Sequence, residues 1–196
     1  MPRPRTLTRD DILPMADYVK LRLEKRRALV ALKQKRQLHV GPHVTVTFEC
    51  WDSMWYQVQE MLYIEKGGDE QLADELAAYG PMVPNGSELV LTLMFEIDDP
   101  GRRAKILGSL GGVEETILLT FAGQEVKAVA EQDIDRTTAD GKTSAVHFLH
   151  FPMTRDQIES FRKPGTQVIF SIGHPHYQHM AVLPETVREA ISGDLG

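Results

Sequence analysis

The hydrophobic periodicity changes along the chain, and this change restricts the fold more than any other feature. In residues 15–36, apolar side chains recur at helical spacing opposite a charged face, and residues 51–66 and 69–79 continue the helical pattern. The later segments instead resemble strands, with alternating or continuously apolar residues bounded by turn signals. These strand patterns cover residues 43–49, 87–96, 117–121, 126–130, 146–151 and 166–172. Helices first and strands later predict an α+β fold: N-terminal helices followed by a largely antiparallel or mixed sheet with flanking helices.

The length and the charge distribution predict one domain with two unlike parts. A chain of 196 residues suffices for one substantial core, so we expect a single α+β domain over residues 1–196. Its basic N-terminal helix would span about 8–37, and its sheet-rich body about 43–196. Residues 1–36 hold 11 of the 22 Lys and Arg but only four acids, a net charge of +7; the rest carries −13, and the total is −6.

This charge asymmetry leaves several partners open. The basic helix could dock on the acidic body, on a second copy in a homo-oligomer, on nucleic acid or on a membrane surface. Nucleic acid is a minor option, because nucleic-acid binders usually carry a basic patch without such an acidic excess, and we expect no membrane partner. No apolar run approaches the ~20 residues that span a membrane. The first residues lack the features of a secretory signal, and the single Cys50 excludes an internal disulfide. Together these observations predict a cytoplasmic protein.

A histidine-rich segment near the C-terminus is the strongest chemical signal. It reads His174-Pro175-His176-Tyr177-Gln178-His179 and follows a predicted strand. Imidazole is the commonest metal ligand and titrates near neutrality. The alternative is an ordinary polar turn, because a metal site usually takes its ligands from separate elements.

Other histidines and glutamates could complete such a site. His43 begins a strand. His147 and His150 lie on opposite faces of another strand, His147 with Leu149 and Phe151 and His150 with Val146 and Phe148. Glu60 interrupts an apolar helix segment, and Glu88 and Glu96 bracket an apolar strand on the same face. Each has an ordinary alternative: a hydrogen-bonded core histidine, or a salt bridge to the arginine-rich first helix.

Several standard motifs are absent. The chain has no glycine-rich dinucleotide loop, no phosphate-binding Gly-Lys-Ser/Thr, no His-Glu-x-x-His and no Gly-x-Ser-x-Gly. We therefore expect no nucleotide cofactor. Cys50 has an acidic neighbour, which disfavours the thiolate, so it is interpreted as a buried residue rather than a nucleophile.

Stretches across nearly the whole chain resemble a bacterial family that is known only as a domain of unknown function. They include residues 7–14, 40–49, 59–62, 78–79, 84–89, 92–96, 147–149 and 174–177. Members of that family are often encoded beside rubrerythrin-like and iron–sulfur redox proteins, which implies a role in iron or peroxide metabolism. The matching positions include His43, Glu60, Glu88, Glu96, His147 and His174. Cys50, His150 and His179 lie outside the pattern, and so does His176, because the stretch 174–177 matches mainly at His174, Pro175 and Tyr177.

Three functional hypotheses follow. The first is a cytoplasmic protein that binds iron or another divalent metal beside a peroxide-handling redox system, with the six matching residues as ligands or acid–base groups. The second is a non-catalytic partner or assembly protein for a rubrerythrin-like or iron–sulfur redox protein, using the basic helix. The third is a metal-free small-molecule enzyme with a Glu/His acid–base pair such as Glu60 and a histidine.

Overall fold

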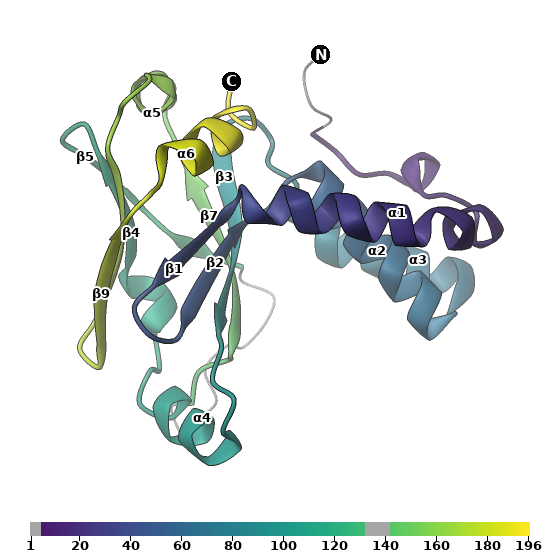
Figure 1. The fold of residues 1–196 in the computed structure, drawn as a ribbon, viewed down its shortest axis with the longest axis horizontal. Helices are drawn as coiled ribbons and strands as arrows, with labels where there is room; N and C mark the ends of the chain where they lie inside the picture. The colour runs from purple at the N-terminus through teal and green to yellow at the C-terminus, as the bar shows by residue number, and fades with distance from the viewer. Residues whose placement is uncertain (1–4, 132–141) are drawn as a thin grey trace.

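Two antiparallel sheets form the larger part of the molecule (Figure 1). The computed structural model describes residues 5–131 and 142–196. The first sheet has the strand order β1-β2-β3-β7-β6 and the second β5-β4-β8-β9. Their bounds are β1 Gln37–Val40, β2 Val44–Phe48, β3 Glu88–Phe95, β4 Ile117–Phe121, β5 Gln124–Lys127, β6 Val129–Ala130, β7 Val146–Pro152, β8 Val168–His174 and β9 Tyr177–Val182.

The main core lies between the two sheets, and strand periodicity explains it. On β3, Leu89, Leu91 and Leu93 are buried on the inner face, and Phe151 of β7 and Phe170 of β8 join them. Side chains alternate between the two faces of a strand, so every second residue of β3 points to the outer face. There Val90 packs into a second core formed by helices. Strand β3 therefore carries residues of both cores.

The two sheets are joined at both sides. At one side, residues 124–130 pair first with β4 and then, as β6, with β7, so that one segment belongs to both sheets. At the other side, the Tyr177 hydroxyl of β9 donates to the Val40 carbonyl of β1 at 2.8 Å. The amide of His43 donates to the same hydroxyl at 3.0 Å. Gly41 forms the tight turn here. The position requires glycine, because its φ is +68° and a Cβ atom would lie 2.5 Å from His179 Cγ.

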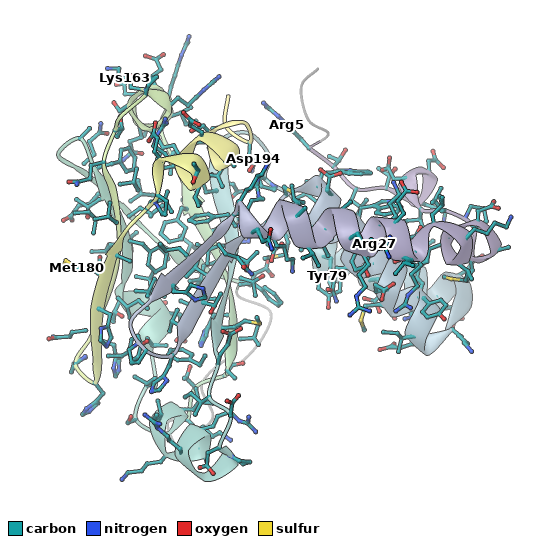
Figure 2. The ribbon with its side chains drawn as sticks, in the orientation of Figure 1. Arg5, Arg27, Tyr79, Lys163, Met180 and Asp194 are labelled. Atoms are coloured by element: carbon teal, nitrogen blue, oxygen red, sulfur yellow. The ribbon has the colours of Figure 1, made fainter. Side chains whose placement is uncertain are left out.

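Three helices form an arm that projects from the sheets (Figure 1): α1 Met15–Gln34, α2 Trp51–Glu65 and α3 Gly68–Tyr79. Helix α1 packs on α2, and α2 packs on α3. Their shared core holds Tyr18, Trp55, Val58 and Leu72. In Figure 2, Arg27 and Tyr79 lie on this helical arm, and Met180 of β9 lies at the opposite side of the molecule.

Shorter helices complete the fold. They are α4 Pro100–Leu107, α5 Arg155–Arg162 and α6 Glu185–Ser192, with 3-10 turns at Arg9–Asp11, Gly80–Met82 and Val113–Thr116. Asp99 caps α4 and Thr154 caps α5 through their side-chain oxygens, which accept backbone N–H groups. In the part of the chain that is described, no helix combines the length and apolar character that crossing a membrane requires.

The structure confirms the predicted α+β fold and corrects two local predictions. The basic helix does not extend to about residue 37: α1 ends at Gln34, and Gln37–Val40 forms β1. The predicted hairpin partner at 126–130 is divided between the two sheets, because Ala128 bonds to Ile117 before the chain turns onto β7. Both errors concern strands of four or fewer residues, which are too short to show a clear periodic pattern.

Candidate binding groove

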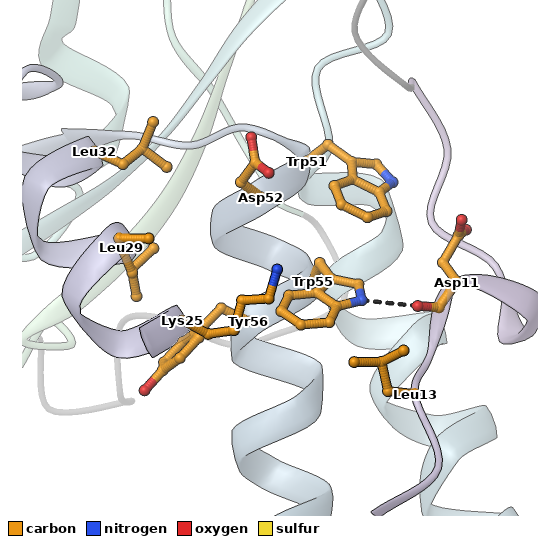
Figure 3. A pocket seen from close by; sticks show the side chains of 10 residues that line it. Asp11, Leu13, Lys25, Leu29, Leu32, Trp51, Asp52, Trp55 and Tyr56 are labelled. Atoms are coloured by element: carbon orange, nitrogen blue, oxygen red, sulfur yellow. Dashed lines mark hydrogen bonds between the residues drawn. The ribbon is translucent and has the colours of Figure 1, made fainter. Parts of the chain in front are cut away.

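A groove with an aromatic floor lies between α1, α2 and the N-terminal segment (Figure 3). Trp51 and Trp55 occupy consecutive turns of α2, and their rings stack with centroids 6.2 Å apart and planes 17° apart. The indole N–H of Trp51 donates to the Thr6 carbonyl at 2.9 Å, and that of Trp55 donates to the Asp11 carbonyl at 2.8 Å. These two bonds hold the N-terminal segment along α2, so the segment forms one wall of the groove.

Helix α1 forms the opposite wall with Lys25, Leu29 and Leu32, as Figure 3 shows. The cavity has a volume of about 480 Å³, which lies within the range of sites that bind small molecules or a few side chains. The Lys25 ammonium lies 5.3 Å from the centroid of the Trp55 ring, a cation–π distance. The residues that line the cavity are Asp11, Leu13, Lys25, Ala28, Leu29, Leu32, Trp51, Asp52, Trp55 and Tyr56.

Glu60 anchors α1 against α2 next to this groove. Its carboxylate accepts two hydrogen bonds from Arg22, both at 2.8 Å, and one from the Tyr18 hydroxyl at 2.5 Å. The Arg22 guanidinium, which also lies 4.4 Å from the Tyr63 ring centroid, lowers the pKa of Glu60 despite partial burial. Burial and the Glu60 carboxylate raise the pKa of Tyr18. This arrangement matches the salt-bridge alternative for Glu60.

The other predicted ligands lie in separate environments. The Glu96 carboxylate accepts a hydrogen bond from Thr45 at 2.6 Å, and the Glu96 amide donates to the His43 carbonyl at 2.7 Å. His43 Nε2 lies 3.4 Å from Arg102 Nη2. His174 is buried, and its Nε2 lies 3.3 Å from the Gly111 carbonyl. Of the six residues, the structure thus places His43 and Glu96 side by side through their backbones.

His147 is a buried residue, which matches the alternative of a hydrogen-bonded core histidine. Its side chain is fully buried, and Nε2 lies 3.0 Å from the Ser144 carbonyl and 3.3 Å from the Thr143 hydroxyl. Nδ1 faces Glu114 Oε2 at 3.9 Å. Among residues 5–131 and 142–196, no group of three or more His, Cys, Asp or Glu side chains is arranged to hold a metal ion. The metal site predicted at His43, Glu60, Glu88, Glu96, His147 and His174 is not tested by these contacts and stays a prediction.

A Glu–His–Glu cluster joins β3 and β7 on the outer face of the first sheet. His150 Nδ1 lies 3.0 Å from Glu88 Oε2, and its Nε2 lies 3.2 Å from Glu131 Oε1. Asn85 donates to the other Glu88 oxygen at 2.6 Å. Hydrogen bonding to Glu88 raises the pKa of His150, and Glu131 adds to this effect while burial opposes it. Sequence reasoning selected Glu88 but missed His150 and Glu131, since they come together only through strand pairing, which places Val90 of β3 and Val129 of β6 opposite His150.

We expect this cluster to make stability depend on pH. A raised pKa in the folded state means that the stabilisation is complete below the unfolded pKa of about 6.5 and is lost as pH rises through the folded value. The difference in unfolding free energy between wild type and His150→Gln should therefore shrink from pH ~6 to pH ~9 in urea titrations. His176→Gln, which alters an exposed histidine, is the control, and an equal pH dependence in both variants would contradict the prediction.

Comparison with known proteins places the chain in a family. The profile of a family described as "Protein of unknown function (DUF3501)" matches residues 6–195. The chain belongs to the DUF3501 family. A crystal structure of a novel protein of unknown function from Burkholderia pseudomallei is 35% identical, with a TM-score of 0.90, and the match covers 97% of this chain and all of that one. No curated protein matches the chain. The resemblance to a domain of unknown function is thereby confirmed.

Proposed function

We propose that this DUF3501 protein is a non-catalytic binding module that holds an acidic, apolar segment of a partner protein in the groove between α1 and α2. The observation that carries the proposal is the cavity of about 480 Å³ with stacked Trp51 and Trp55 as its floor. Aromatic residues in a concave site are the usual anchors of protein interfaces. Of the three functions predicted from the sequence, this one corresponds to the partner or assembly protein.

The charge of α1 supports an acidic partner. The helix contains six basic and two acidic residues, a net charge of +4, and Lys25 lies at the groove itself. A segment with apolar side chains at helical spacing and acidic flanks would place its apolar face on the indoles and a carboxylate near Lys25, the cation that lines the groove. Complementary charge of this kind increases the association rate and makes binding sensitive to salt.

The chain contains a built-in reporter for this proposal. It has only two tryptophans, and both line the groove, so intrinsic fluorescence measures groove occupancy directly. We would titrate the protein with a peptide of about five helical turns that carries leucines at i, i+3, i+4 and i+7 and glutamates elsewhere. A matched peptide with lysines in place of the glutamates tests the charge requirement. We expect a saturable change in emission with the acidic peptide alone.

A pair of matched variants separates groove binding from surface attraction. Ala28 and Ala31 both lie exposed on α1, but only Ala28 lines the groove. Ala28→Glu should weaken binding of the acidic peptide by about tenfold or more, equivalent to ~1.4 kcal/mol. Ala31→Glu, with the same change in net charge, should leave binding nearly unchanged. Equal affinity of both variants, or no response to the acidic peptide, would overturn the proposal. Saturable binding of anilinonaphthalene sulfonate without any peptide binding would indicate a small-molecule site instead.

A further inference from the structure

Helix α1 exposes a second apolar surface that does not belong to the groove. Val19, Leu23 and Val30 are 51%, 61% and 54% exposed. Their spacings of four and seven residues place them on one side of the helix, within about 40° of each other at 3.6 residues per turn. Single exposed apolar residues are ordinary, but a row of them on one helix marks an interaction surface. We call these three residues the outer stripe.

The outer stripe lies on a different side of α1 from the residues that contact its own chain. The residues of α1 that contact α2 include Tyr18, which is fully buried, and Arg22, which binds Glu60. Leu29 lines the groove. At about 100° per residue, the outer stripe is centred roughly 100° around the helix from these three residues. The stripe is therefore separate from both the intramolecular contact and the groove.

Basic side chains flank the outer stripe and determine which partner fits. Arg26 and Arg27 are exposed and lie on its two sides by helical spacing, and Lys20 lies beyond Arg27. Two α1 helices, each with a net charge of +4, would repel each other if they packed stripe to stripe. The fitting surface is therefore acidic, with side chains small enough for the stripe to pack closely against it.

Helix α3 carries such a surface in every copy of the chain. It contains four acidic residues and no basic one, a net charge of −4 that is opposite to that of α1. Glu70 and Asp74 are exposed, and the exposed Ala73 and Ala77 lie between acidic side chains on the same face. Asp69 already pairs with Arg9 of its own chain at 3.0 Å, so Glu70 and Asp74 are the carboxylates available to a partner.

We infer that the chain forms a two-fold dimer in which the outer stripe of α1 packs on α3 of a second copy. A two-fold axis makes this contact twice, because each copy supplies one basic α1 and one acidic α3. Val19, Leu23 and Val30 would cover Ala73 and Ala77, while Arg26 and Arg27 would bind Glu70 and Asp74. The groove and the outer stripe use different faces of α1, so a dimer can still bind a peptide.

Charge reversal with rescue tests this dimer. The full chain should sediment as a dimer in analytical ultracentrifugation at low salt. Both Arg26→Glu/Arg27→Glu and Glu70→Lys/Asp74→Lys should sediment as monomers, because each variant brings like charges together. An equimolar mixture of the two variants should recover the dimer, since the reversed α1 of one now faces the reversed α3 of the other. All replaced side chains are exposed, and circular dichroism would verify that both variants fold.

Several outcomes would overturn the inference. A wild type that stays monomeric at ~100 µM, where a dimer with a Kd of about 1 µM (about −8 kcal/mol) would be almost fully formed, would exclude it. Dimers that persist in the α3 variant would point to contact between two α1 helices or elsewhere, and variants that do not recover in the mixture would exclude the α1–α3 pairing. Leu23→Glu should abolish the dimer and leave peptide binding intact, whereas Ala28→Glu should do the reverse. Failure of the dimer and failure of the groove are thus distinguishable.

Discussion

Replacing Arg36 by alanine is expected to lower the free energy of unfolding by about 3–5 kcal/mol, the range found when one partner of a buried ion pair is removed. Arg36 is only 1% exposed. Its guanidinium pairs with buried Asp194 and donates to the Phe48 carbonyl at 2.8 Å and to the Glu49 carbonyl at 3.0 Å. The substitution would leave a buried carboxylate and two buried carbonyls without this donor.

Replacing Arg36 should loosen both the base of the helical arm and the C-terminal segment after α6. Arg36 lies where α1 passes into β1, and Asp194 follows α6, so their pairing attaches the C-terminus to the base of the helical arm. Urea unfolding followed by circular dichroism measures the loss. Arg155→Ala is the control, because its side chain is 91% exposed and its ion pair with Glu159 should contribute less than ~0.5 kcal/mol. A loss below ~1 kcal/mol for Arg36→Ala would show that the pair adds little.

A second partner substitution separates the pair from its surroundings. Asp194→Asn keeps the size of the side chain but removes the charge that balances Arg36. We expect the double variant Arg36→Met/Asp194→Leu to lose less unfolding free energy than the sum of the losses for Arg36→Met alone and Asp194→Leu alone. The reason is that the double variant leaves no unpaired charge buried. Strict additivity would argue that the two side chains act independently.

Tyr177→Ala is expected to lower the free energy of unfolding by about 3–5 kcal/mol, as is typical for removing a buried aromatic ring. The ring is 4% exposed and packs edge-on against Phe95 with centroids 5.6 Å apart. Its hydroxyl connects β9 to β1 through Val40 and His43. Loss of the side chain would open a cavity and also release the contact that joins the two sheets at this side.

Tyr177→Phe isolates the hydroxyl from the ring. It should lower the free energy of unfolding by about 1–3 kcal/mol, because the Val40 carbonyl and the His43 amide lose a buried partner while packing is kept. Relative to wild type, Tyr177→Phe should accelerate hydrogen exchange of the amides of β1 and β9 more than that of the amides of β3, which lies inside its sheet. A uniform change across all strands would mean that the hydroxyl contributes to global stability but not to the local joining of β9 and β1.

The types of element could be read from the sequence because they depend on local periodicity. The predicted helix at 51–66 is α2 Trp51–Glu65, and the strand at 87–96 is β3 Glu88–Phe95. Parity also placed His147 and His150 on opposite faces of their strand, and the structure shows His147 on the buried face. Each inference needs only the repeat of a helix or a strand over neighbouring residues.

The candidate groove was harder to predict from the sequence than the elements were. Trp51 and Trp55, four residues apart and the only two tryptophans of the chain, mark one face of α2, and this signal was available. The groove also needs α1 and the N-terminal segment on either side, and those contacts depend on Thr6 and Asp11 reaching α2. The histidine-rich segment was the strongest chemical signal, yet its His174 bonds to the Gly111 carbonyl and its Tyr177 joins two sheets.

By itself the sequence determined the α+β class, the charge contrast between the basic first helix and the acidic remainder, and the face on which most strand residues lie. Only the tertiary structure decided which distant groups meet. Arg36 pairs with Asp194 across 158 positions, and His150 lies between Glu88 and Glu131. The physical reason is that periodicity is set by backbone geometry within a few residues, whereas these contacts depend on how strands pair and how the chain closes on itself.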